Sequence, residues 1–261
     1  MLQNMYLPSL TLNCFMRTTA LTLLLLVCFA PPVAKSQAMS VAYSGYHIHG
    51  GTKKDSSMVA MLAKYKDSVG KAMNTIVGFS VHGLYKKQPE SVLGNFMADA
   101  VKTIGEQVFK QPIDAAFINY GGVRGYIPKG DITIGQMFEL MPFDNILVLQ
   151  KIKGDSLLSF LDHVADKNGW PISGITMNIR EKKAVDILVG GKPLSLDSSY
   201  TIANADYIVN GGDDTNMLKI FPKISNGYLV RDALISYVKL LTDLGRPIDA
   251  KIEKRITYAD N

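Results

Sequence analysis

Hydrophobic and polar positions follow two different periods along the chain after about residue 55. Apolar residues at helical spacing, with Asp55, Ser91, Thr133 and Asp155 as expected caps, predict helices over residues 55–73, 91–110, 133–141, 155–164 and 229–244. Short apolar runs predict strands over residues 75–80, 115–118, 145–152, 174–180, 185–189 and 200–205, with a Gly-Gly hairpin turn at 190–191. Helices and strands alternate without a repeat or an interdomain linker. Residues 55–261 are therefore expected to form one α+β domain, a mixed β-sheet with packed helices.

The N-terminal segment has the pattern of a secretory signal peptide. Arg17 precedes a largely apolar run over residues 18–30, and Ser36-Gln37-Ala38 fits a cleavage site between small residues. We expect residues 1–38 to be this signal, with Met16 as the start and residues 1–15 as an over-extended start. The apolar run is too short for a transmembrane span, so the mature chain is expected to be periplasmic or extracellular, with residues 39–54 as a flexible lead-in.

Cysteine usage and net charge exclude several kinds of chemistry. Cys14 and Cys28 both precede the expected cleavage site, so neither a disulfide nor a thiolate is expected in the mature protein. Attachment of a lipid at Cys28 is an alternative, although Val27 stands where a small residue is expected. Removal of Arg17 and Lys35 with the signal lowers the formal charge from +5 to +3. This mild excess, without basic runs interleaved with aromatics, does not indicate a nucleic-acid partner.

The candidate chemistry lies in the loops that adjoin predicted strands. The strand over residues 115–118 leads into Asn119-Tyr120-Gly121-Gly122-Val123-Arg124, where paired glycines favour close approach of the backbone and dihedrals closed to other residues. Arg124 offers a planar fork of donors that suits a phosphate or a carboxylate. Residues 141–145 (Met-Pro-Phe-Asp-Asn) place an aromatic beside an amide, and Gly211-Gly212-Asp213 presents a carboxylate from a tight turn. An ordinary turn remains the alternative for each motif taken alone.

In their order and spacing, these motifs resemble the C-terminal, substrate-binding domain of the 5'-nucleotidase family, from about Asp55 to Tyr258. The resemblance implies a substrate site made of Asn119, Gly121, Gly122, Arg124, Phe143, Asn145, Tyr207 and Asp213. By that likeness Phe143 and Tyr207 sandwich a nucleobase, and Asn119 bonds the base edge. Asp213 then accepts from ribose hydroxyls, and Arg124 holds phosphate. The alternative for the two aromatic rings is a place in the core.

Several residues depart from the family pattern. Tyr120 and Asp214 stand where glycine is usual; the first is expected to narrow the approach to the base and the second to add negative charge near the phosphate. Asp144 also replaces a glycine, and aspartate tolerates left-handed dihedrals. Residues 85–87 (Tyr-Lys-Lys) lie where members carry phosphate-binding arginines, but the match is in charge only. We expect a solvated loop here, with a phosphate contact as the alternative. Trp170 lies in a loop near the region that lines the pocket in family members, and its contact with ligand is left open.

The histidines do not predict a metal site. Full-length members of the resembled family carry a metal-binding phosphoesterase domain in which a His-x-His pair contributes to a two-metal centre, and residues 47–49 (His-Ile-His) form such a pair. No acidic residue precedes Asp55, and His82 and His163 lie on separate elements and are expected to be structural. A dinuclear site needs several such ligands around both ions. The pair is therefore interpreted as part of the lead-in, and neither a cofactor nor a catalytic residue is expected in this chain.

The resemblance leaves alternative functions open. The first is the nucleotide-recognition half of a 5'-nucleotidase system, inactive alone, in which a separately encoded metallophosphoesterase supplies divalent metals and the attacking water. The second is a non-enzymatic extracytoplasmic protein that binds or scavenges nucleosides or nucleotides. The third is a domain kept for structure or assembly, with a pocket that binds nothing.

Overall fold

The computed structural model describes residues 41–47, 49–51 and 54–259, apart from the side chain of residue 67. The chain divides after Lys54 into two units, which are described separately. In the first unit the described residues are exposed and form neither helix nor strand. The expected signal peptide, with Cys14 and Cys28, lies outside the described residues, as do parts of the expected lead-in. Within the described residues, no helix is long and apolar enough to cross a membrane.

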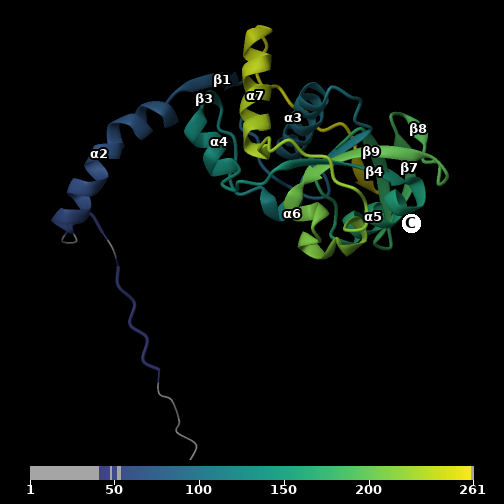
Figure 1. The fold of residues 1–261 in the computed structure, drawn as a ribbon, viewed down its shortest axis with the longest axis horizontal. Coiled ribbons are helices and arrows are strands. Elements are labelled where there is room, and N and C mark those ends of the chain that lie inside the picture. Colours follow the sequence, from purple (N-terminus) through teal and green to yellow (C-terminus); the bar gives the residue numbers. More distant parts are fainter. Residues whose placement is uncertain (1–40, 48, 52–53, 260–261) are drawn as a thin grey trace, which may run out of the picture. The chain divides into compact units, whose positions relative to one another are not determined.

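Helices and strands of the second unit, Asp55–Asn261, are mixed along the chain (Figure 1). The helices are α2 Ser56–Met73, α3 Val92–Phe109, α4 Ile134–Leu140, α5 Gly154–Asp166, α6 Asp206–Val209 and α7 Val230–Asp243, with short 3-10 turns η1 Tyr120–Gly122, η2 Gly212–Asp214 and η3 Asn216–Leu218. The strands are β1 Ile76–Ser80, β2 Ala115–Phe117, β3 Gly130–Thr133, β4 Leu147–Lys153, β5 Ile172–Ser173, β6 Ile175–Arg180, β7 Lys183–Val189, β8 Lys192–Pro193, β9 Ser199–Ala205 and β10 Ile256–Tyr258. The prediction of an α+β fold is confirmed.

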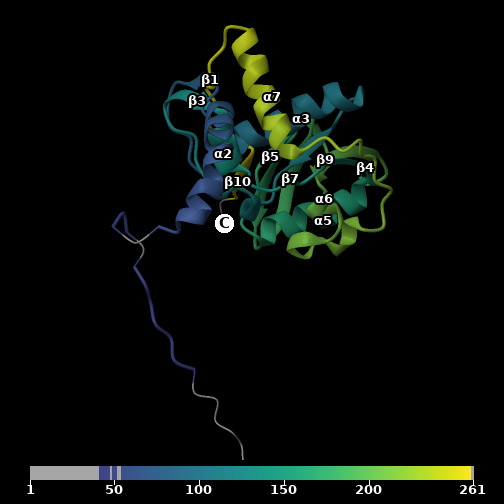
Figure 2. The same ribbon diagram turned by 60° about the vertical axis from the view of Figure 1, so that its left-hand side comes forward.

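The strands are arranged in separate sheets rather than in one. The central sheet has the order β4-β9-β2-β5, in which β2 runs parallel to β9 while β4 and β5 run antiparallel to their neighbours. A second sheet has the order β10-β6-β7-β8, and β1 pairs with β3. Figure 2 shows α3 and α7 over one side of the central sheet and α5 and α6 over the other. The central sheet is therefore buried on both faces.

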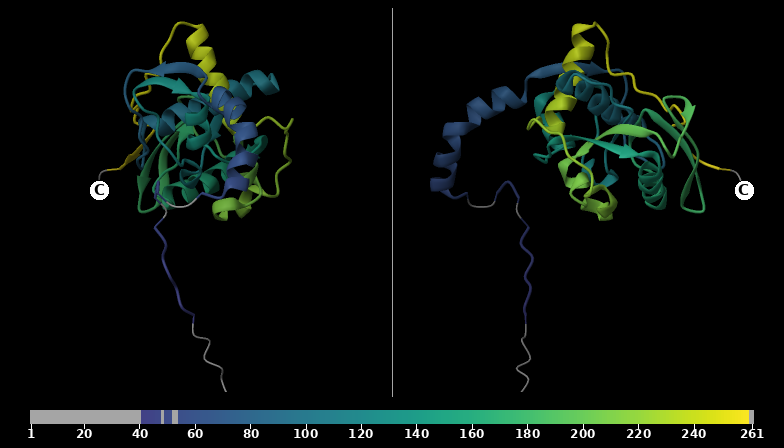
Figure 3. Two further views of the ribbon diagram at one scale, coloured as in Figure 1. Left: turned by 90° about the vertical axis from the view of Figure 1, so that its left-hand side faces the viewer. Right: turned by 45° about the vertical axis from the view of Figure 1, so that its right-hand side comes forward.

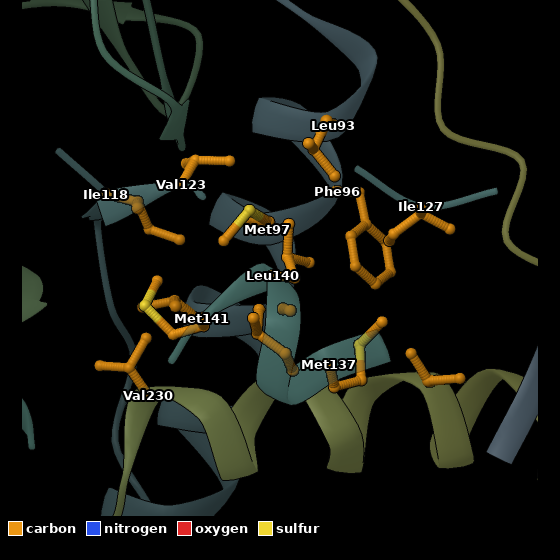
Figure 4. Packing of buried hydrophobic residues seen from close by; sticks show 14 of the residues in the cluster. Leu93, Phe96, Met97, Ile118, Val123, Ile127, Met137, Leu140, Met141 and Val230 are labelled. Carbon is orange, nitrogen blue, oxygen red and sulfur yellow. The ribbon is translucent and has the colours of Figure 1, made fainter. Parts of the chain in front are cut away.

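Alternation along the central strands fills two hydrophobic cores. On β2, Ala116 belongs to a core shared with α3 and α7, whereas Ala115 and Phe117 belong to a core shared with α5 and the second sheet. Successive side chains of a strand point to opposite faces, so a strand covered on both sides is apolar throughout. Figure 4 shows part of the first core, to which α3 contributes Leu93 and Met97, α4 contributes Leu140 and α7 contributes Val230. The two cores fix β2, β4 and β9, whose ends carry the motifs found in the sequence.

Helix α2 differs from the other long helices because its apolar side chains are exposed. Asp55 caps it as predicted, through bonds from the Ser57 and Met58 amides to its carboxylate. However, the side chains that recur at helical spacing are half or more exposed: Met58 50%, Leu62 54%, Tyr65 62% and Val69 50%. At the C-terminal end of α2, Met73 lies against Gly135 of α4. The periodicity thus predicted the helix correctly, while its apolar face does not contribute to the described cores.

Most local predictions are confirmed, with some corrections. Ser91 caps α3, and Thr133 begins α4 with a full capping box. The prediction that Asp155 caps the next helix is wrong: Lys153 is the cap residue of α5 and Asp155 lies in its first turn, where its carboxylate accepts from the Ser156 amide. The 190–191 turn is confirmed by positive φ at both glycines. Strands β3, β5, β8 and β10 were not predicted, and Figure 3 shows β10 leading to the C-terminus.

Candidate functional site

The residues expected to bind a ligand lie around one cavity. Its volume is about 300 Å³, and it is lined by Asn119, Gly121, Gly122, Arg124, Phe143, Asn145, Tyr207 and Asp213. These residues come from η1 and the turn after it, from the loop before β4, and from the α6–η2 segment. Because β2 and β9 are parallel neighbours and β4 is antiparallel to β9, the ends of β2 and β9 and the start of β4 meet at one edge of the sheet. The topology thus brings together segments far apart in the sequence.

The carboxylate of Asp213 is the centre of a hydrogen-bond network inside this cavity. Its Oδ2 accepts from Asn119 Nδ2 at 2.6 Å, and its Oδ1 accepts from the Tyr207 hydroxyl at 2.9 Å. An ionised carboxylate only accepts, so the amide nitrogen of Asn119 must face it. The bond to Asp213 raises the pKa of Tyr207 because it stabilises the protonated phenol. Two carboxylate oxygens offer about four acceptor positions, so further donors can still bind Asp213.

The main chain at Asp213 is left-handed, an uncommon state for a residue with a side chain. Asp213 has φ 51° and ψ 36°; Gly211, two residues earlier, has φ 92°, and Asp214, the next residue, has φ 66°. Such a conformation costs roughly 1–2 kcal/mol per non-glycine residue and persists where surrounding contacts enforce it. Here the Asp213 carbonyl oxygen lies 2.8 Å from Nε2 of His163, on helix α5. Asp213 is thus fixed through both its main chain and its carboxylate.

Gly122 and Gly212 are required for space rather than for unusual dihedrals. Neither Gly121 nor Gly122 has a positive φ, so the expectation of dihedrals closed to other residues is wrong for this pair. A Cβ at Gly122 would lie 2.6 Å from Asn119 Oδ1, whereas a Cβ at Gly121 would meet nothing closer than 3.7 Å. A Cβ at Gly212 would overlap the Tyr207 ring. The lack of a Cβ at Gly122 and Gly212 therefore leaves room for the side chains of Asn119 and Tyr207, which donate hydrogen bonds to Asp213.

Arg124 and Phe143 form another part of the cavity wall. The guanidinium carbon of Arg124 lies 5.2 Å from the centroid of the Phe143 ring, in the range of a cation–π contact. Arg124 is exposed and makes no ion pair with any residue that the structure describes. Phe143 and Tyr207 line the same cavity, yet within the described chain they are not among the ring pairs in direct contact. The rings of Phe143 and Tyr207 are thus separate parts of the cavity lining, and the guanidinium of Arg124 lies beside the Phe143 ring.

The loop that carries Phe143 is held by a buried arginine of α7. Arg231 donates to the Phe143 carbonyl oxygen at 3.2 Å and to the Asp144 carboxylate at 2.7 Å. Its guanidinium also lies 4.0 Å from the centroid of the Phe138 ring. Asp144 does not adopt the left-handed conformation considered for it in the sequence, and its carboxylate serves this ion pair instead. Arg231 was not identified from the sequence, because nothing near it resembles a site motif.

Other departures from the family pattern point away from the cavity. Tyr120 does not line it; its ring packs against the second core, with Lys86 Nζ 4.6 Å from the ring centroid. Lys86 also donates to the Val123 carbonyl oxygen at 2.8 Å. Residues 85–87 are exposed and do not line the cavity, which agrees with the expected solvated loop. Asp214 pairs with Lys167 at 3.4 Å and does not line the cavity, contrary to the charge expected near a phosphate.

Trp170, His82 and His163 do not line the cavity. Trp170 is 3% exposed and packs in the second core rather than in the cavity wall. His82 Nε2 lies 3.2 Å from the Ala250 carbonyl oxygen, a structural contact. His163 was expected to be structural, and its Nε2 lies 2.8 Å from the carbonyl oxygen of Asp213, which lines the cavity. No sequence signal connects residues 163 and 213. Among the described residues no group of three or more His, Cys, Asp or Glu side chains is arranged to hold a metal ion.

Comparisons with known proteins identify the family of this chain. The sequence model of the family described as "5'-nucleotidase, C-terminal domain" matches residues 68–220, more than half of the chain. A 5'-nucleotidase of Vibrio cholerae is 30% identical over 145 residues, which are 52% of this chain and 25% of that protein. The trifunctional nucleotide phosphoesterase protein YfkN of Bacillus subtilis is 28% identical over 220 residues, 75% of this chain and 14% of that protein.

Solved structures of two nucleotidases share the fold of this chain. The crystal structure of a 5'-nucleotidase precursor from Thermus thermophilus superposes with a TM-score of 0.67 at 26% sequence identity, covering 78% of this chain and 43% of that one. The NAD nucleotidase of Haemophilus influenzae shares the fold at 17% identity, with a TM-score of 0.61. The chain spans a quarter or less of the length of the Vibrio and Bacillus relatives and less than half of the Thermus structure.

Proposed function

Since this chain belongs to the 5'-nucleotidase C-terminal domain family, we propose that its cavity binds a nucleoside or nucleotide as the recognition part of a nucleotide phosphohydrolase system. The observation that carries this proposal is the set of side chains that line the cavity. Two aromatic rings, two amides, a carboxylate and an arginine surround a volume of about 300 Å³. Such a combination of apolar faces with a few placed polar groups is typical of small-molecule sites.

The aromatic residues are assigned to the base. Phe143 and Tyr207 line the cavity without direct ring contact, which supports the insertion of a flat ring between them. Stacking of a base on an aromatic side chain contributes roughly 1–3 kcal/mol. Tyr207 is held against Gly212 and bonded to Asp213, so its ring is fixed before a ligand arrives. Asn119 is assigned to the base edge through its Oδ1, since its Nδ2 is bonded to Asp213.

The charged residues are assigned to the sugar and the phosphate. Asp213 retains acceptor capacity for ribose hydroxyls beyond its bonds from Asn119 and Tyr207. Arg124 is exposed at the cavity wall, and its planar fork matches phosphate oxygens. Its guanidinium lies beside the Phe143 ring, so a phosphate bound there would be next to a base stacked on Phe143. Asn145 supplies a further polar contact.

The groups in this cavity bind and orient, and the proposal assigns the hydrolytic step to a metallophosphoesterase. That enzyme would hold the divalent metals and the attacking water, and this chain would be inactive alone. The Thermus and Vibrio relatives are longer proteins of which this chain matches a part, which is consistent with a system that needs more than this domain. We further propose that the chain is exported, from the signal-peptide pattern of residues 1–38.

The test of this function separates binding from hydrolysis. Adenosine, AMP, UMP and UDP-sugars are screened by thermal shift, since a ligand that binds the native state stabilises it by RT ln(1 + [L]/Kd). Release of phosphate from AMP is then measured with divalent metal, with and without an added metallophosphoesterase. We expect a thermal shift with at least one nucleoside or nucleotide and hydrolysis only with the added enzyme. Hydrolysis by the purified chain alone would refute the division of labour. Binding without any gain in hydrolysis would indicate a nucleotide-binding or scavenging protein.

A further inference from the structure

The main chain of Asp213 is held by a side chain from another element of the fold. His163 lies fifty residues earlier in the sequence, on α5, and its Nε2 donates to the Asp213 carbonyl oxygen at 2.8 Å. A carbonyl oxygen only accepts, so Nε2 must carry a proton; the Nε2-protonated neutral ring and the imidazolium both meet this condition. The contact can therefore exist whether the ring is neutral or charged.

An aromatic cluster fixes the His163 ring. The ring lies edge-to-face with Trp170, with centroids 5.8 Å apart and an interplanar angle of 87°. Trp170 packs in turn on Phe160 at 5.9 Å, and Phe160 packs on Phe117 at 4.8 Å. Phe117 is the last residue of β2, two positions before Asn119. The cluster thus connects His163 to the strand that carries Asn119.

We propose that His163 is a positioning residue of the cavity. By bonding the main chain of Asp213 in its left-handed conformation, it aims the carboxylate at Asn119 and at the cavity. Without this donor the turn has lost one of the contacts that enforce its conformation, and the carboxylate is free to leave its position. The consequence for nucleotide affinity rests on the proposed function, whereas the consequence for the turn does not.

Two substitutions distinguish the donor from the ring. His163→Phe keeps an aromatic ring against Trp170 and removes the donor. His163→Gln removes the ring and places an amide N–H near the position of Nε2. His82→Phe is the matched control, because it removes a ring-nitrogen contact to a main-chain carbonyl, that of Ala250, away from the cavity lining. If His163→Phe does not fold, His163→Asn takes its place, since its shorter amide does not reach the Asp213 carbonyl.

The first measurement needs no ligand. Amide hydrogen exchange is followed in a peptide that covers residues 207–215, where the Thr215 amide bonds to the Gly212 carbonyl oxygen. A hydrogen bond of ordinary strength changes an equilibrium by about fivefold to tenfold. We expect exchange about fivefold to tenfold faster in His163→Phe than in the natural protein, and within about twofold of it in His163→Gln and His82→Phe.

The second measurement is the Kd of AMP, obtained by calorimetry with the same proteins. We expect a Kd about fivefold to tenfold higher in His163→Phe and within about twofold of the natural value in the other two. Unchanged exchange in His163→Phe would overturn the proposal. Equal acceleration in the Phe and Gln variants would also overturn it, because the effect would then come from ring packing. Absence of AMP binding to the natural protein would contradict the proposed function while leaving the exchange result to decide the role of His163.

Discussion

Alanine substitutions in the Gly121–Gly122 pair should have opposite effects although the two positions are adjacent. At Gly122 a Cβ would lie 2.6 Å from Asn119 Oδ1, which forces the Asn119 side chain to rotate away. Rotation breaks the 2.6 Å bond from Asn119 Nδ2 to Asp213. At Gly121 the nearest atoms to a Cβ are at 3.7 and 4.0 Å, an ordinary van der Waals separation, and φ is not positive. Only the first substitution should therefore disturb the cavity.

The magnitude follows from the bond that is lost. A hydrogen bond to a charged group contributes about 1.5–3 kcal/mol, and an unstrained glycine-to-alanine change stabilises by about 0.4–1 kcal/mol through the unfolded state. Gly122→Ala should then lower the free energy of unfolding by about 1–2 kcal/mol, and Gly121→Ala should raise it slightly. For a domain of this size each kcal/mol shifts Tm by about 2–4 °C. The two variants, which differ by the bond that is lost, should differ in Tm by roughly 3–12 °C.

Thermal unfolding followed by far-UV circular dichroism measures this difference without any ligand. The double variant Gly122→Ala with Asn119→Ala supplies the control, since the clash disappears once the Asn119 amide is removed. Adding Gly122→Ala to Asn119→Ala should thus cost nothing further. Equal Tm values for the two single glycine variants, or a lower Tm for Gly121→Ala, would refute the assignment of Gly122 as the space for Asn119.

Further predictions concern the supporting loop, the phenol and the helices. Replacement of Arg231 by lysine should lower the free energy of unfolding in urea by about 2 kcal/mol or more, since a buried ammonium cannot reproduce the fork of bonds to the loop before β4. The bond to Asp213 raises the pKa of Tyr207, so its contribution to stability is complete below about pH 10 and is lost as pH rises through the raised folded value. The stability difference between the natural protein and Tyr207→Phe should therefore shrink above pH 10, in urea titrations at pH 9 and 11. Leu93→Ala, at a fully buried position, should cost about 2–5 kcal/mol in urea, whereas Leu62→Ala, at a 54% exposed position, should cost less than about 0.5 kcal/mol.

The sequence predicted the elements and motifs whose causes are local. Helix caps such as Asp55 and Ser91 accept hydrogen bonds from amides two or three residues further along the chain. Such caps can be predicted because all the residues involved are close together in the sequence. The cavity residues could be grouped because three motifs matched a family in order and spacing. The structure then supplied the reason: the parallel pair β2–β9 and the antiparallel strand β4 bring those loops to one edge.

What the sequence could not predict depends on contacts between distant segments. His163 bonds a carbonyl fifty residues away, and Arg231 holds a loop some ninety residues earlier in the chain. Neither residue stands in a pattern that distinguishes it from a surface or core position. The exposure of α2 is another case, since a helical period of apolar residues is the same whether or not a partner covers it. Likewise, the Tyr120 ring contacts Lys86 and the second core, which involve residues distant in the sequence, so its direction could not be predicted from the residues beside it.

Calorimetric titration of the natural protein and of Phe143→Ala with AMP and adenosine tests the central claim most directly. The claim is that the cavity lined by Phe143 and Tyr207 accepts a nucleobase. Stacking energies of roughly 1–3 kcal/mol per base predict measurable binding to the natural protein and a Kd about fivefold to 150-fold higher for Phe143→Ala. No heat with either ligand in the natural protein, or an unchanged Kd in Phe143→Ala, would contradict it.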